Sequence, residues 1–210
     1  NIRLHILGIG EEKKLNREKI RKAAGSIANY ALCMKIKEFY IHTDIPKITP
    51  NHSVEAITEG LLLGEYRFDK YKTENKKDTI KLKSATIYTT SKEKNLESLI
   101  KQTAIVCNAT NYTRDLQTEN ADVANPLFLE KQAREIAKKH KLKLNVLDEK
   151  KLKKMGANLI LAVGSGSKYP PRIITLHYKG NLKSKESIAI LGKGITFDTG
   201  GINLKPTGYI

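Results

Sequence analysis

The chain has 210 residues, 40% of them hydrophobic, which suffices for one large or two small packed domains. Its 38 lysines and arginines outnumber 22 aspartates and glutamates, and the formal charge of +16 raises nonspecific affinity for nucleic acids and anionic surfaces. The longest apolar run, 159–163, is far shorter than the ~18 residues of a membrane span, so we expect a soluble protein without a membrane partner.

The ends and the cysteines bear on where the protein works. Residue 1 is Asn and the chain stops at Ile210, and we interpret both ends as cut, so that a targeting segment could precede Asn1. Cys33 and Cys107 lie in helical patterns without CxxC spacing, which suits a reducing compartment. We therefore expect a cytoplasmic protein.

The first part of the chain predicts a small amino-terminal α/β domain at 1–91. The expected elements are a strand at 2–7, an amphipathic helix at 20–34, a strand at 39–42, a helix capped by Asn51 or Ser53 and ended by Gly64, and a strand-like stretch at 79–90. The aromatic set that follows Gly64 suggests core packing or an interface rather than a ligand site; its members are Tyr66, Phe68 and Tyr71.

A helical pattern from Leu96 to Thr110 marks the best domain boundary, so we expect a linking helix at 92–113. Residues 114–210 then read as a second α/β domain. Its expected elements are a helix opened by Asn125-Pro126 and strands at 142–146, 157–163, 172–178 and 187–191.

The most informative run is Gly192-Lys193-Gly194-Ile195-Thr196-Phe197-Asp198-Thr199-Gly200-Gly201-Ile202-Asn203-Leu204-Lys205-Pro206, which follows the apolar strand expected at 187–191. Ligands of α/β sheets gather where strands end. Four glycines let the backbone take positive φ or approach a ligand closely, which favours a site. The alternative is that Lys193 and Asp198 form an ordinary ion pair.

This run resembles the first metal-binding signature of the leucyl aminopeptidases, also called cytosol aminopeptidases. Further matching segments lie at 59–72, 113–116, 162–167 and 170–172. The resemblance covers nearly the whole chain. It implies a small amino-terminal α/β domain, a linking helix and the beginning of an α/β catalytic domain with a mixed sheet.

The resemblance also implies roles for three residues. Lys193 would be a metal ligand, Asp198 would bridge two divalent ions, Zn²⁺ or Mn²⁺, and Lys205 would stabilise the tetrahedral intermediate by its charge. No residue is assigned to another cofactor. The remaining ligands of the family would lie beyond Ile210, so we expect this chain alone to be inactive as a metallo-aminopeptidase.

Peptides are the implied substrates, and a homohexamer is the implied assembly of the full-length protein. An alternative of another class is a basic nucleic-acid-binding module or a hexamer-assembly module. The lysine clusters at 138–143 and 150–154 fit solvated faces, which favours the enzyme. The five histidines lack metal-ligand spacing, and 164–168 lacks the spacing of a phosphate-binding loop.

Overall fold

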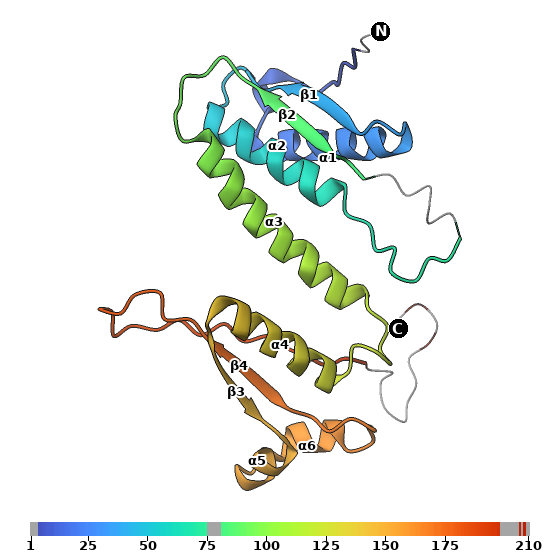
Figure 1. The fold of residues 1–210 in the computed structure, drawn as a ribbon, viewed down its shortest axis with the longest axis vertical. Helices are drawn as coiled ribbons and strands as arrows, with labels where there is room; N and C mark the ends of the chain where they lie inside the picture. Colours follow the sequence, from blue (N-terminus) through green and yellow to red (C-terminus); the bar gives the residue numbers. More distant parts are fainter. Residues whose placement is uncertain (1–3, 75–80, 198–205, 207, 209–210) are drawn as a thin grey trace. The chain divides into compact units, whose positions relative to one another are not determined.

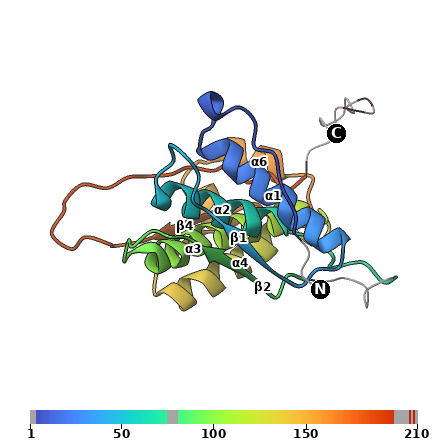
Figure 2. The same cartoon turned by 90° about the horizontal axis from the view of Figure 1, so that it is seen from above.

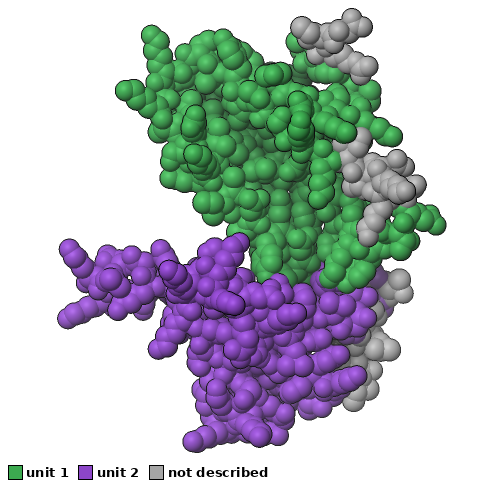
Figure 3. All heavy atoms as spheres, viewed as in Figure 1, with its two compact units in different colours: residues 1–118 green, residues 119–210 purple. Residues whose placement is uncertain are grey.

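The computed structural model describes residues 4–74, 81–197, 206 and 208. The backbone forms two compact units, Asn1–Thr118 and Glu119–Ile210 (Figure 3). Each has its own helices and its own two-stranded sheet (Figure 1). The expected α/β class is confirmed, with one parallel and one antiparallel strand pair. The domain limits expected at residues 91 and 113 stay a prediction. None of the described helices is long and apolar enough to cross a membrane.

The first unit packs a sheet of two strands on two helices. Its elements are a 3-10 helix η1 (Glu12–Lys14), α1 (Arg17–Cys33), β1 (Glu38–His42), α2 (Pro50–Gly64), β2 (Ser84–Tyr88) and α3 (Leu96–Thr118). β1 and β2 are parallel, with Glu38 opposite Ser84 and His42 opposite Tyr88. In Figure 2, which views the unit from above, α1 and α2 lie along one side of the two strands.

Apolar residues from both layers fill the space between this sheet and its helices. The buried cluster consists of Ile20, Ala24, Ala28, Ala56, Ile57 and Leu61. One face of the sheet packs against it through Phe39, Ile41, Ala85 and Ile87. The intervening strand residues are exposed, as the two-residue period of a strand requires when one face is solvated.

Helix α2 begins earlier than the sequence predicted. The expected cap at Asn51 or Ser53 is wrong, because the Thr49 hydroxyl accepts a hydrogen bond from the backbone N–H of His52 at 3.4 Å. Pro50 then occupies the first turn, where its missing N–H leaves no helical hydrogen bond unmade. The expected end at Gly64 is confirmed.

The strand expected at 2–7 is wrong for the residues that the structure describes. Residues 4–10 are irregular, and the side chains of Leu4 and Ile6 are 83% and 90% exposed. A strand needs a hydrogen-bonded neighbour, and no described segment pairs with residues 4–7. The alternation of apolar residues is therefore not enough to form a strand in this segment.

Three glycines bring α1 and α2 into contact at backbone distance. A Cβ atom at Gly60 would lie 2.2 Å from the carbonyl oxygen of Arg21 and 2.6 Å from the Cβ atom of Ala24. A Cβ atom at Gly64 would lie 2.7 Å from the Cα atom of Gly25. The two helices can approach this closely only because these positions carry no side chain.

Side chains of α3 cap the carboxyl end of α2. The last four carbonyls of a helix have no partner within the helix. The Asn111 amide donates to the Leu62 carbonyl at 3.0 Å, and the Arg114 guanidinium donates to the Leu63 carbonyl at 3.0 Å. The positive charge of Arg114 also complements the partial negative charge of this helix end.

The second unit pairs its strands in the antiparallel sense. Its elements are α4 (Pro126–His140), β3 (Lys143–Leu147), α5 (Glu149–Lys154), α6 (Asn158–Gly164) and β4 (Ile173–His177). Lys143 lies opposite His177, and Leu147 lies opposite Ile173. The Asn125 side chain accepts hydrogen bonds at the start of α4, so the predicted Asn125-Pro126 start is confirmed.

The strand expected at 157–163 is wrong, because residues 158–164 form helix α6. A short apolar run fits a buried strand or a helix, and its periodicity does not separate them. With no strand beside it in the described part of the unit, the segment satisfies its backbone groups internally as a helix.

We predict that Gly60→Ala lowers the free energy of unfolding of the first unit by about 1–3 kcal/mol, because the new methyl overlaps backbone and side-chain atoms of α1. The gain in helix propensity, about 1 kcal/mol, offsets only part of this. Urea unfolding followed by circular dichroism measures the change. Gly8→Ala is the control, since no atom lies within 4 Å of its added methyl. Equal unfolding midpoints for the two variants would contradict the close-contact argument.

Candidate functional site

The segment that leads to the predicted site leaves the sheet after β4. Residues 178–197 have no regular secondary structure, so the strand expected at 187–191 is wrong. The side chains of Ile188, Ile190 and Leu191 are 93%, 95% and 92% exposed. No described segment offers this run a hydrogen-bonded neighbour, and an unpaired run does not hold a strand.

Lys193 is the one predicted site residue within the described part of the chain, and its side chain is exposed. A Cβ atom added at Gly192 or Gly194 would meet no atom within 4 Å. In this structure nothing therefore packs against these two glycines closely enough to require the absence of a side chain. Asp198 and Lys205 lie outside the described residues. The convergence of the three side chains, and the alternative ion pair between Lys193 and Asp198, therefore stay predictions.

The described residues hold no group of three or more histidine, cysteine or carboxylate side chains that could bind a metal ion. His42 lies 3.4 Å from the Asp44 carboxylate, and His5 makes an edge contact with the Tyr30 ring. These are ordinary polar and aromatic contacts.

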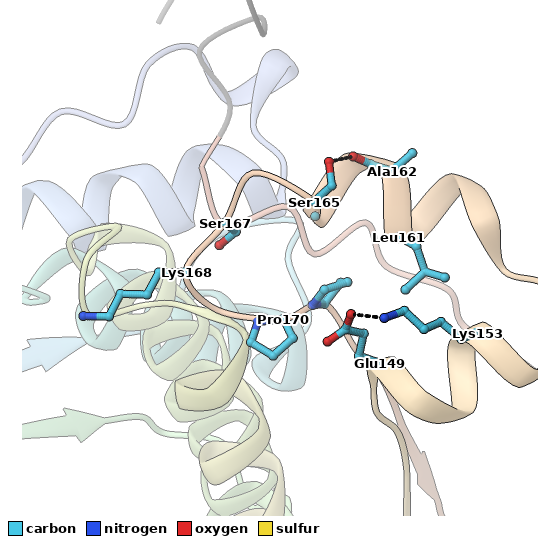
Figure 4. Close-up of a pocket in the computed structure, with 10 residues that line it drawn as sticks. Glu149, Lys153, Leu161, Ala162, Ser165, Ser167, Lys168 and Pro170 are labelled. Atoms are coloured by element: carbon cyan, nitrogen blue, oxygen red, sulfur yellow. Dashed lines mark hydrogen bonds and ion pairs between the residues drawn. The ribbon is translucent and has the colours of Figure 1, made fainter.

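A cavity of about 650 Å³ lies beside α5 and α6 (Figure 4). A Glu149–Lys153 ion pair of 2.7 Å stands at its edge, and the Ser165 hydroxyl donates to the Ala162 carbonyl at 2.8 Å. The loop 165–168 follows the carboxyl end of α6, where the helix dipole is negative. Phosphate loops precede a helix instead, which agrees with the mismatch in their spacing.

The matching segment at 170–172 holds α4 and β4 together. The Arg172 guanidinium forms an ion pair with the Glu130 carboxylate, and their side chains are 9% and 14% exposed. The guanidinium of Arg134 donates to the same carboxylate at 2.8 Å. Desolvation acts to raise the pKa of Glu130, but the hydrogen bonds and charges of Arg134 and Arg172 outweigh it and lower that pKa.

The matching segments at 59–72 and 113–116 touch each other. The Tyr66 hydroxyl donates to the Asp115 carboxylate at 2.8 Å, and the Arg114 guanidinium lies 3.8 Å from the centre of the Tyr66 ring. Desolvation and the hydrogen bond to Asp115 raise the pKa of Tyr66. Tyr66 therefore packs against α3 through Arg114 and Asp115, which agrees with the packing role that the sequence suggested.

Two models of one known family together match most of the chain. The model of the N-terminal domain of the cytosol aminopeptidase family matches residues 2–75, and that of the catalytic domain matches residues 111–210. The chain belongs to the cytosol aminopeptidase family. The resemblance seen in the sequence is thereby confirmed at the level of both domains.

Individual relatives agree with this assignment. The chain is 39% identical over 211 residues to a probable cytosol aminopeptidase of Protochlamydia amoebophila, covering 100% of this chain and 42% of the relative. It is 35% identical to one of Aquifex aeolicus, covering 99% and 41%. The chain thus spans about two fifths of the length of these curated relatives.

Solved structures show the same fold. The bottromycin maturation enzyme BotP in complex with Mn is 26% identical, with a TM-score of 0.80 over 96% of this chain and 41% of that one. A tomato leucine aminopeptidase mutant is 23% identical, with a TM-score of 0.66 over 74% of this chain and 32% of that one, which is a likeness of fold alone.

Sequence reasoning missed what three of the four upstream segments of the family do in this structure. Those at 59–72 and 113–116 join α2 to α3, and that at 170–172 joins β4 to α4. Arg172 and Glu130 are 42 residues apart, and no local pattern signals such a pair.

We predict that Arg172→Met lowers the free energy of unfolding by about 2–3 kcal/mol, because it removes one partner of an ion pair that is largely shielded from solvent. Arg134→Met is the matched control. Its 60% exposed side chain binds the same carboxylate from the surface, and its loss should cost less than about 1 kcal/mol. Chemical unfolding of both variants measures the difference, and equal costs would contradict the role given to Arg172.

Proposed function

We propose that this chain supplies the amino-terminal domain and the first metal-binding segment of a two-metal leucyl aminopeptidase, which removes N-terminal residues from peptides. The observation that carries the proposal is the fifteen-residue run 192–206 within a chain that matches both domain models of the family. The Mn-bound relative of the same fold supports divalent ions as the cofactors, and we propose Mn²⁺ or Zn²⁺.

Three side chains of the run would carry the chemistry. The Lys193 amine would ligate a metal ion after losing its proton, and the Asp198 carboxylate would bridge two ions. The Lys205 ammonium would stay charged and stabilise the oxyanion of the tetrahedral intermediate. Bound divalent ions lower the pKa of a water molecule and polarise the peptide carbonyl.

The donor set fits such a site only in part. One amine and one carboxylate cannot hold two ions, and no other metal-binding group occurs in the described residues. Because the chain spans about 42% of its relatives, we propose that the other ligands come from the part of the family fold outside it. A homohexamer and a cytoplasmic location complete the proposal, by analogy with the family.

For the chain alone, we predict weak Zn²⁺ or Mn²⁺ binding and no turnover of a chromogenic leucine substrate, because ligands for a two-metal site are missing. Calorimetric titration and an absorbance assay measure the two quantities. Lys193→Met should leave the titration unchanged, because in the chain alone the Lys193 amine keeps its proton and cannot ligate a metal ion. Tight stoichiometric binding together with turnover would show that the catalytic groups have been misplaced.

In a longer polypeptide that carries these residues with the rest of the family fold, Asp198→Asn should abolish peptidase activity and reduce bound metal. Lys205→Ala should lower kcat by about 10²–10³ while the metal stays bound, as expected for one electrostatic stabiliser. Elemental analysis and steady-state kinetics separate the two effects. Equal loss of metal in both variants would contradict the separate roles of ligand and stabiliser.

A further inference from the structure

The cavity beside α5 and α6 is large enough to hold a small molecule. Its volume of about 650 Å³ falls within the range of about 300–1,000 Å³ that is usual for small-molecule sites. Residues 149–171 of the second unit supply all of its walls. These residues lie outside the run 192–206, so none of them has a role in the metal site proposed above.

One wall of the cavity is held in place by the close packing of α6 against two prolines. A Cβ atom at Gly164 would lie 2.7 Å from Cγ and 2.8 Å from Cδ of Pro171. The end of α6 and Pro171 touch in this way only because Gly164 carries no side chain. The rings of Pro170 and Pro171 also fix their own backbone φ angles, so this wall is largely pre-formed.

Apolar side chains supply part of the cavity surface. Leu161 of α6 lines the cavity together with Pro170 and Pro171. The Leu161 side chain is half-buried, and in Figure 4 it points toward the Glu149–Lys153 ion pair. A ligand with an apolar group of its own would remove this surface from water, which is favourable.

Charges of both signs lie next to each other at the edge of the cavity. The Glu149 carboxylate and the Lys153 ammonium, one turn apart on α5, form an ion pair of 2.7 Å in which the side chains are 42% and 65% exposed. An ion pair this exposed is held only weakly, so a ligand can take over both charges at little cost. Lys168 also lines the cavity, but its side chain points away from this pair (Figure 4).

We propose that this cavity binds a free α-amino acid with an apolar side chain. The ligand's ammonium binds Glu149, its carboxylate binds Lys153, and its side chain lies against Leu161 and the two prolines. A free amino acid carries both charges on one carbon atom, which matches two neighbouring protein groups. In a peptide at least one further residue separates the charges. The binding needs no metal ion, so it goes beyond the proposed peptidase and does not depend on it.

The test is an NMR chemical-shift titration of the full isotope-labelled chain with L-leucine, in the presence of a chelator that removes metal ions. The dissociation constant should be on the order of 1 mM, as expected for so small a ligand. Leucinamide lacks the carboxylate and N-acetylleucine lacks the ammonium, so each should bind about 10-fold more weakly than leucine. The dipeptide leucyl-leucine should also bind more weakly, because its two charges are farther apart.

Variants of α5 test the two charged groups. Glu149→Gln and Lys153→Met should each weaken leucine binding about 10-fold. Lys150→Met is the matched control, since Lys150 is exposed on the same helix outside the cavity wall, and it should change the affinity less than about twofold. Lys153→Met should leave the weak binding of leucinamide unchanged, because that ligand has no carboxylate. Circular dichroism confirms that each variant is folded.

Three results would overturn the inference. The first is the absence of shifts at about 20 mM leucine, well above the expected dissociation constant. The second is binding of leucinamide, N-acetylleucine or leucyl-leucine as tightly as leucine. The third is an equal loss of affinity in Lys150→Met and Lys153→Met.

Discussion

The first unit depends on the contact between α1 and α2, in which Gly25, Gly60 and Gly64 replace side chains by backbone. This contact sets the width of the layer on which β1 and β2 lie. It also fixes where α2 ends, because Gly64 is both a contact residue and the last residue of the helix. The carbonyls at the end of α2 consequently face the part of α3 that carries Asn111 and Arg114, which donate hydrogen bonds to them. A helix pair held farther apart would lose the sheet support and the capping together.

The elements that the sequence predicted well are those with a local signal. Asn125-Pro126 indicates the start of α4, and Gly64 indicates the end of α2, because the interactions that cap a helix involve only a few neighbouring residues. The strands near 39–42, 142–146 and 172–178 were also found. Segments 2–7, 157–163 and 187–191 were misjudged as strands, since a strand is completed by a neighbour that the local sequence does not specify.

For the candidate site too, the local sequence predicted some features and left out those that depend on distant residues. Residue types and spacing within 192–206 were enough to indicate the family, whereas the chemistry assigned to the run stays a prediction. The geometry of the site stays a prediction, because Asp198 and Lys205 lie outside the described residues. The contact of Tyr66 with Asp115 spans 49 residues, and the pairing of Lys143 with His177 depends on strand register. Only the folded chain reveals such pairs.

The exposed run at 187–191 has a consequence for how copies of this chain behave together. Its residues are uncharged and mostly apolar, and their backbone N–H and C=O groups have no strand neighbour in the described structure. This is the condition under which segments of separate molecules pair edge to edge. Lys183, Lys185 and Glu186 stand just before it and act as charged gatekeepers against such pairing. The colloidal stability of the chain thus rests on charge repulsion, and screening by salt weakens it.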